Sequence, residues 1–228
     1  MAKKDKLPRK TKHQKERAQE VLGKLYEQYP NPHCELNYET PFQLLIATIL
    51  SAQCTDVRVN MVTETLFKEY PDPQAFADAD LAELELAVKP TGFYRNKALS
   101  LKEASQRILE VYDGEVPQNM DDLLTLRGAA RKTANVVLGN AFNINHGVVV
   151  DTHVKRISKR FGFTRHDNPE KVEKDLMALF SQEEWTNLSH LMIFHGRRSC
   201  KARFKNPPDD ELCKTYGIKC ECQKMRDD

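Results

Sequence analysis

The sequence of 228 residues has little glycine, no long apolar segment and almost no net charge. With nine glycines and no alternating apolar pattern flanked by hairpin turns, it offers no convincing sheet. No apolar run approaches the roughly 18 to 20 residues that span a bilayer. The N-terminus leads into polar sequence instead of the apolar core of a signal peptide. No period of about 20 to 50 residues repeats, which disfavours a solenoid. We expect a cytoplasmic protein without membrane association.

Charge is balanced overall but unevenly distributed. The 35 Lys and Arg residues against 33 Asp and Glu leave a formal charge of +2, which indicates no particular partner. Between Lys3 and Arg17, however, there are eight basic residues and only two acidic ones, Asp5 and Glu16. This basic arm can attract a polyanion. On composition alone, a solvated tail is the favoured interpretation.

Apolar residues recur at helical spacing, three and four positions apart, in several segments. The positions are Leu101, Ala104, Ile108 and Val111; Val172, Leu176, Leu179 and Phe180; and Trp185, Leu188 and Met192. Thr40 followed by Pro41 predicts the start of a deeply buried helix over residues 42–50. Turn residues divide the chain into about ten helices, and the one candidate strand, residues 148–150, is too short to form a sheet. The fold class is therefore all-α.

Residues 123–138 (LLTLRGAARKTANVVL) predict a short helix, a glycine turn and a second helix. Gly128 can adopt a positive φ, which lets backbone N–H groups point outward where the second helix begins. Such donors, with the helix dipole, bind phosphate, and Arg127, Arg131 and Lys132 surround the turn. By itself a turn of this kind is weak evidence, because many glycine turns only join packed helices.

A carboxylate follows nineteen positions after Lys132. Asp151 stands where an extended segment ends and the next helix begins. The more common role of an aspartate in this position is to cap the helix. The glycine turn and the carboxylate that follows it are stronger evidence for a functional site together than either feature is alone.

Five segments together resemble the endonuclease III family of DNA base-excision glycosylases. Residues 126–156 are similar to the family's helix-hairpin-helix and the loop with aspartate that follows it. Residues 50–56 (LSAQCTD), 92–98 (GFYRNKA), 114–117 (GEVP) and 195–197 (HGR) match further family segments in the same order. The resemblance covers about residues 20 to 200.

The resemblance implies that Lys132 is the nucleophile and Asp151 the essential carboxylate. A neutral lysine amine can attack C1′ of a damaged nucleotide, and the neighbouring Arg131 favours that neutral form. A fixed carboxylate stabilises the positive charge that develops on the sugar. The Schiff base then permits β-elimination. The implied activity is a bifunctional glycosylase and AP lyase that excises oxidised pyrimidines from duplex DNA.

The resemblance also implies the residues that contact DNA. They are Gln53, Phe93, Arg127, Gly128, Ala130, Arg131 and Thr133. Gln53 and Phe93 would fill the space left by the everted nucleotide, Gln53 as a polar and Phe93 as an apolar wedge. The alternative for Phe93 is a core aromatic residue. Arg127 and Ala130 depart from the family pattern, because they replace its proline and its second glycine.

The cysteine pattern departs further from the family. Members of the family usually hold a [4Fe-4S] cluster on four C-terminal cysteines separated by six, two and five residues. Here twelve, six and one residues separate the C-terminal four, Cys200, Cys213, Cys220 and Cys222. Cys200 and Cys213 match the family's first and last ligands, but the two middle ligands are missing. We expect no cofactor; the alternative is a rearranged iron–sulfur or zinc site on the four cysteines.

We expect two helical lobes with a DNA-binding cleft between them. Residues 35–144 form the lobe with the helix-hairpin-helix, and residues 1–34 with 145–228 form the other. The expected partner is double-stranded DNA with damaged bases or abasic sites. We expect the protein to be a monomer associated with the nucleoid. Two alternatives remain: a monofunctional mismatch or adenine glycosylase, which would not need Lys132, and a non-catalytic helix-hairpin-helix module.

Overall fold

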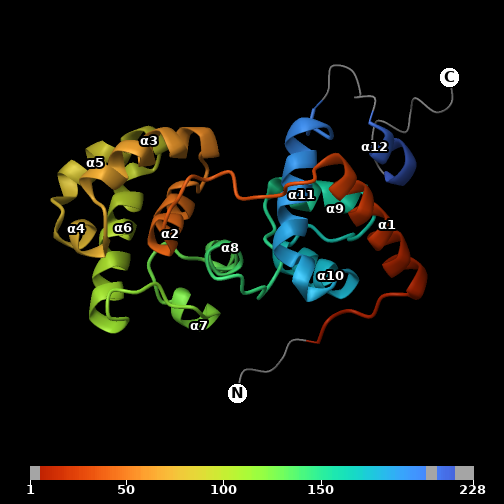
Figure 1. The fold of residues 1–228 in the computed structure, drawn as a ribbon, viewed down its shortest axis with the longest axis horizontal. Coiled ribbons are helices and arrows are strands. Elements are labelled where there is room, and N and C mark those ends of the chain that lie inside the picture. Colours follow the sequence, from red (N-terminus) through yellow and green to blue (C-terminus); the bar gives the residue numbers. More distant parts are fainter. Residues whose placement is uncertain (1–5, 204–209, 219–228) are drawn as a thin grey trace. The chain divides into compact units, whose positions relative to one another are not determined.

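The structure is a computed structural model that describes residues 6–203 and 210–218. Every regular element in these ranges is a helix, so the expected all-α class is confirmed (Figure 1). The α-helices are α1 (Lys12–Gln28), α2 (Pro41–Leu50), α3 (Asp56–Glu69), α4 (Pro73–Asp78), α5 (Leu81–Val88), α6 (Tyr94–Val111), α7 (Met120–Leu123), α8 (Arg131–Ala141), α9 (Thr152–Arg160), α10 (Pro169–Leu179), α11 (Trp185–Arg198) and α12 (Glu211–Tyr216). Two 3₁₀ helices are also present: η1 (Lys89–Thr91) lies between α5 and α6, and η2 (Gln182–Glu184) lies between α10 and α11. Among the residues described, no helix has both the length and the apolar composition needed to cross a bilayer.

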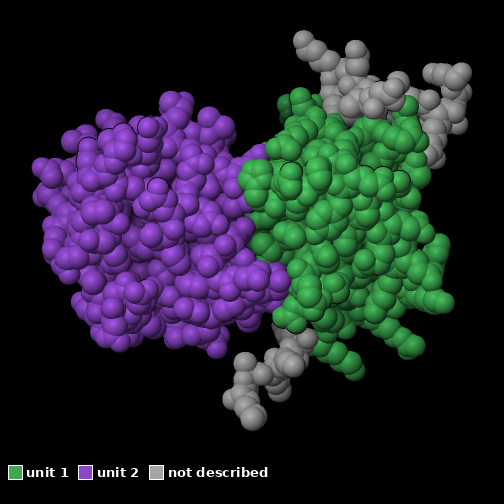
Figure 2. All heavy atoms as spheres, in the orientation of Figure 1, with its two compact units in different colours: residues 1–33, 147–228 green, residues 34–146 purple. Residues whose placement is uncertain are grey.

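The chain divides into two compact units, coloured separately in Figure 2. Unit 1 consists of residues 1–33 and 147–228, and unit 2 of residues 34–146. The sequence interpretation placed the inner boundaries at residues 35 and 144. Unit 2 therefore contains the hairpin with Lys132, and unit 1 contains Asp151.

Helix α2 is the centre of the core of unit 2. Thr40 caps it by accepting a hydrogen bond from the backbone N–H of Gln43 (3.2 Å), and Pro41 occupies its first turn. All residues from Phe42 to Leu50 except Gln43 are buried. The helix packs against α3, α6 and α8, so it is covered on several sides. The predicted buried helix is confirmed.

The three apolar stripes predicted from the sequence pack into the two cores. Leu101, Ala104 and Ile108 of α6 are fully buried in unit 2. Val111, at the end of that stripe, is 50% exposed, because it is the last residue of α6 and lies beyond the core. The stripes of α10 and α11 belong to the core of unit 1.

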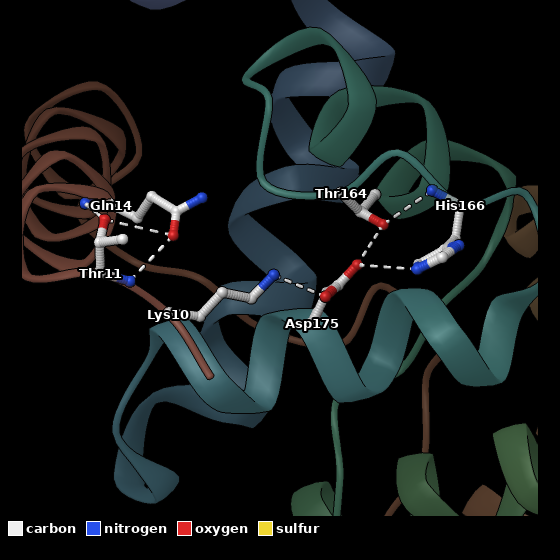
Figure 3. Close-up of polar contacts among 6 residues, drawn as sticks. All are labelled: Lys10, Thr11, Gln14, Thr164, His166 and Asp175. Carbon is white, nitrogen blue, oxygen red and sulfur yellow. Dashed lines mark hydrogen bonds and ion pairs between the residues drawn. The ribbon is translucent and has the colours of Figure 1, made fainter. Parts of the chain in front are cut away.

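The segment before α1 is held against α10 of the same unit by an ion pair. Lys10 Nζ lies 2.6 Å from Asp175 Oδ1 on α10, and the Thr164 hydroxyl donates to the other oxygen of Asp175 at 2.6 Å (Figure 3). A capping box between Thr11 and Gln14 then starts α1. The expected solvated tail is therefore wrong for Lys10, whose side chain is only 11% exposed. The sequence did not reveal Asp175 as its partner because 165 positions separate the two residues.

Candidate functional site

The glycine turn between α7 and α8 lies tightly against the core of unit 2. Gly128 has φ = +84°, a conformation that side chains with a Cβ rarely adopt. A Cβ added there would also lie 3.1 Å from Ser100 Cβ and 3.2 Å from Ile49 Cγ2. Both the positive φ and the small space at Gly128 therefore require glycine. The positive φ is the conformation that the sequence predicted.

The start of α8 has no side-chain cap. Its N-cap residue is Ala130, whose methyl group cannot accept a hydrogen bond from the first N–H groups of the helix. Thr133 is 8% exposed, so little of this residue is accessible for a phosphate contact. Ala130 is exposed and presents only a methyl group.

The charged residues of the turn differ in their surroundings. Lys132 is exposed in the first turn of α8. Arg127 is also exposed, but both oxygens of Glu103 accept hydrogen bonds from its Nη1, at 3.0 and 2.9 Å. Any phosphate contact of Arg127 must compete with this carboxylate. The sequence missed Glu103 because it lies on α6, 24 positions away.

Gln53 and Phe93 are both presented to solvent by a left-handed backbone. Their φ values are +54° and +50°, uncommon for residues other than glycine. Phe93 is 65% exposed and is the N-cap residue of α6. This exposure excludes the core aromatic interpretation of Phe93. Strained backbone of this kind is often found at ligand-binding sites.

A buried lysine joins the two segments that carry these residues. Lys97 Nζ donates to the backbone carbonyls of Leu50 and Thr91, each at 2.8 Å. Burial lowers the pKa of Lys97, which is only 6% exposed, although the nearby Cys54 acts in the opposite direction. Leu50 ends α2 shortly before Gln53, and Thr91 ends η1 shortly before Phe93. Lys97 thus fixes both segments, a role that the sequence did not reveal.

Asp151 lies in unit 1 as the N-cap residue of α9. Its Oδ1 accepts a hydrogen bond from the backbone N–H of Val154 at 2.7 Å. The side chain is half-buried, and Oδ2 has no hydrogen-bond partner among the described residues. Asp151 therefore caps α9 through Oδ1, and its Oδ2 is left for other contacts.

Helix α9, which Asp151 caps, lies very close to α11. A Cβ on Gly196 would lie 2.9 Å from His153 Nδ1 and 3.0 Å from Arg156 Nη2. Arg156 Nη2 donates to the carbonyl of Gly196 at 2.8 Å. Burial lowers the pKa of His153, with the charges of Arg156 and Arg197 acting in the same direction and that of Asp151 opposing them. The sequence did not identify His153 as part of this site.

A second polar group lies inside unit 1. His195, Cys200 and Cys213 are each 0% exposed, and their ligating atoms lie within 4.8 Å of one another. His195 Nε2 is 3.2 Å from Cys213 Sγ, and Arg160 Nη1 is 2.9 Å from Cys200 Sγ. Hydrogen bonding with Cys213, and also with His195 and Arg160, lowers the pKa of Cys200 to about 4, although burial opposes this shift. Cys220 and Cys222 lie outside the described residues.

A family model described as "HhH-GPD superfamily base excision DNA repair protein" matches residues 46–182. Endonuclease III of Synechocystis sp. is 55% identical over 197 residues, which cover 86% of this chain and 90% of that protein. Endonuclease III of Bacillus subtilis is 46% identical over 183 residues, covering 80% and 83% respectively.

Solved structures give the same result. A non-covalent endonuclease III–DNA complex matches with a TM-score of 0.85 and 43% identity, covering 93% of this chain and 97% of the other. A trapped endonuclease III–DNA covalent intermediate also matches with a TM-score of 0.85, at 42% identity over 94% and 99%. A thermostable thymine-DNA glycosylase at 18% identity and a TM-score of 0.75 shares the fold.

Proposed function

Because the chain belongs to the endonuclease III family of the HhH-GPD superfamily, we propose that Lys132 and Asp151 carry its chemistry. The protein is a bifunctional DNA glycosylase and AP lyase of base excision repair. The observation that carries the assignment of Lys132 is its exposure in the first turn of a helix whose N–H groups no side chain caps. These donors suit a DNA phosphate, which would hold the strand beside the amine.

Lys132 takes part in both steps, as the nucleophile in the first and as the Schiff-base nitrogen in the second. Its neutral Nζ forms a bond to C1′ as the N-glycosidic bond breaks, and the departing base takes up a proton. One proton then passes from this nitrogen to a base and another is taken up by the ring oxygen O4′. The C1′–O4′ bond breaks, and a protonated Schiff base forms between Nζ and C1′. Removal of a proton from C2′ then expels the 3′-phosphate, which cuts the strand and leaves the Schiff base to be hydrolysed.

Asp151 supports the first step. Its capping bond to the N–H of Val154 fixes the carboxylate, and Oδ2 remains for the substrate. A fixed negative charge stabilises the positive charge that develops on the sugar as the glycosidic bond breaks. The same carboxylate can accept a proton from the attacking amine. Asp151 therefore serves both as a helix cap and as a catalytic residue.

Gln53 and Phe93 fill the space that the everted nucleotide leaves. Both side chains are exposed, and Lys97 holds the segments before them through the carbonyls of Leu50 and Thr91. An apolar side chain inserted between base pairs compensates part of the cost of unstacking, a few kcal/mol. Gly128, Ala130, Arg131 and Thr133 contact the phosphates of the same strand through backbone and charge, and Arg127 does so in competition with Glu103.

The proposed substrates are oxidised pyrimidines in duplex DNA, because lesions that stack or pair poorly cost least to evert. The protein acts as a monomer on nucleoid DNA. Duplexes with thymine glycol, dihydrouracil, 8-oxoguanine or an A·G mismatch test this assignment. We expect excision of the first two with strand cleavage in neutral buffer. Excision of adenine from the mismatch, with cleavage only after alkali, would instead indicate the monofunctional glycosylase.

Replacing Asp151→Asn separates binding from chemistry. Asparagine caps a helix about as well as aspartate, so the fold should be retained. We expect lesion DNA to bind as before and single-turnover excision to fall by several orders of magnitude. Asp167→Asn, the same change at an exposed carboxylate of unit 1 that pairs with Lys159, is the matched control. Unchanged excision by Asp151→Asn would contradict the catalytic role of Asp151. A wild-type protein that binds lesion DNA without excising the base would favour the non-catalytic DNA-binding module.

A further inference from the structure

Three separate segments of unit 1 bring soft metal ligands together. His195 lies in α11, Cys200 follows that helix, and Cys213 lies in α12. All three are fully buried, with ligating atoms within 4.8 Å of one another. Imidazole and thiolate are the ligands that zinc prefers in proteins. Neither the catalytic chemistry nor the DNA contacts proposed above use these groups.

This donor set does not fit the [4Fe-4S] cluster of the family. A cubane needs four thiolates that converge on one centre. Within residues 6–203 and 210–218, the group contains two thiols and one imidazole. A single metal ion requires only that the ligands surround one point, and three donors within 4.8 Å of one another meet this condition.

We propose that His195, Cys200 and Cys213 bind one zinc ion. Tetrahedral zinc with Zn–S of about 2.3 Å and Zn–N of about 2.0–2.1 Å places a nitrogen and a sulfur ligand about 3.6 Å apart. His195 Nε2 and Cys213 Sγ are 3.2 Å apart, so they need to separate by only a few tenths of an ångström. A water molecule completes the tetrahedron.

The surroundings already orient these ligands. The Tyr29 hydroxyl lies 3.4 Å from His195 Nδ1, which leaves Nε2 directed at Cys213. Arg160 Nη1 lies 2.9 Å from Cys200 Sγ and stabilises its thiolate. Partners of this kind fix the orientation of metal ligands. Two thiolates also neutralise the charge of Zn²⁺, so the ion and its three protein ligands together carry no net charge.

The consequence of the site is a link between helices. Arg160 ends α9, the helix that Asp151 caps, and also donates to the carbonyl of Lys201 at 2.7 Å. A zinc ion held by α11, α12 and Cys200 would therefore fix the C-terminal part of unit 1 next to α9. One ion would here perform the structural part of the role that the family resemblance implies for an iron–sulfur cluster.

Metal analysis of the purified full-length protein tests the proposal. We expect about one zinc per chain in protein expressed with zinc, and, after replacement by Co²⁺, visible ligand-field bands with sulfur-to-cobalt charge transfer. Cys200→Ser and Cys213→Ser should lose most of the metal. Cys34→Ser, a half-buried cysteine of unit 2, is the matched control and should retain it.

Wild-type protein alone decides the question if the cysteine variants fail to fold. Co²⁺ titrated into chelator-treated wild-type protein should saturate at one equivalent, and zinc should displace the colour. Less than about a tenth of an equivalent of zinc with no cobalt bands would overturn the proposal. So would iron with acid-labile sulfide in equal amounts. These readouts are independent of DNA cleavage, so the zinc site and the proposed catalytic roles can fail separately.

Discussion

Phe93 combines a left-handed backbone with an exposed aromatic ring, so little of its side chain contributes to the core. Phe93→Ala should change the free energy of unfolding by less than about 0.5 kcal/mol, as at most surface positions. Affinity for lesion DNA should fall about 5- to 150-fold, which corresponds to the roughly 1–3 kcal/mol lost when an aromatic–base stack is removed. Fluorescence anisotropy and urea denaturation measure the two quantities.

Leu86→Ala is the matched control for this change. Leu86 lies on α5 in the same unit and is 67% exposed, about as much as Phe93. Its replacement should affect neither stability nor DNA binding. If both variants bind lesion DNA as well as the wild type, Phe93 is not a wedge.

His153 makes stability depend on pH. Burial holds its pKa in the folded protein below the ordinary 6.5, so the folded state disfavours the charged imidazolium. Between these two pKa values the unfolded chain binds a proton that the folded protein does not. The free energy of unfolding should therefore decrease as the pH falls through about 6.5, and the contribution of His153 should vanish above about pH 7.5.

Urea denaturation from pH 5 to 8 measures this dependence. His153→Gln removes the titrating group, so the variant should lose less stability than the wild type over the same pH range. The other titrating groups are the same in both proteins, so their contributions cancel in the comparison. Identical pH dependence in the two proteins would mean that burial of His153 does not disfavour its charged form.

At the scale of elements, the packing of α9 on α11 depends on Gly196. Gly196→Ala would bring a Cβ to 2.9 Å from His153 Nδ1 and 3.1 Å from His153 Cβ, so the helices must move apart. We expect a loss of about 1–3 kcal/mol in the free energy of unfolding, the usual cost of overpacking. Excision should slow as well, because α9 positions Asp151.

Gly23→Ala is the opposite case in the same unit. Gly23 lies inside α1, and a Cβ there would meet nothing within 4 Å. This substitution should stabilise the protein by about 0.5–1 kcal/mol, because alanine is a better helix former than glycine. Thermal or urea denaturation compares the two variants. Equal effects of both would show that the close approach of α9 and α11 does not constrain Gly196.

The helices and the hairpin could be predicted from the sequence because their signals are local. Thr40 and Pro41 mark the start of α2, Gly128 marks the hairpin turn, and both appear as expected. Apolar spacing likewise identified the buried faces of α6, α10 and α11. The candidate site residues Lys132, Asp151, Gln53 and Phe93 came from the motif resemblance, because each lies in or beside a short segment typical of the family.

Interactions between distant residues could not be predicted in this way. Lys97 joins the ends of α2 and η1, Glu103 pairs with Arg127, and Asp175 binds Lys10. In each case the partner's position depends on how helices pack, which spacing along one segment does not encode. The group of His195, Cys200 and Cys213 was missed for a related reason, since the spacing of cysteines alone does not include the histidine.

At the scale of the whole molecule, the proposed chemistry draws on both units. Lys132 belongs to unit 2 and Asp151 to unit 1. In the proposal both act on the same nucleotide, Lys132 by attack and Asp151 by stabilising charge. Losing either residue should therefore abolish strand cleavage while each unit keeps its own core, and only the lysine variant should lack the amine that forms a covalent adduct.

Borohydride trapping on a duplex with an abasic site tests the central claim most directly. Borohydride reduces a Schiff base to a stable amine, so the wild-type protein should form a covalent adduct with DNA, and peptide mass spectrometry should locate it on Lys132. Lys132→Gln should bind the duplex and give no adduct, whereas Lys155→Gln, a lysine on α9, should trap like the wild type. An adduct of wild-type yield in Lys132→Gln, or one mapped to another amine, would contradict the assignment of Lys132 as the nucleophile.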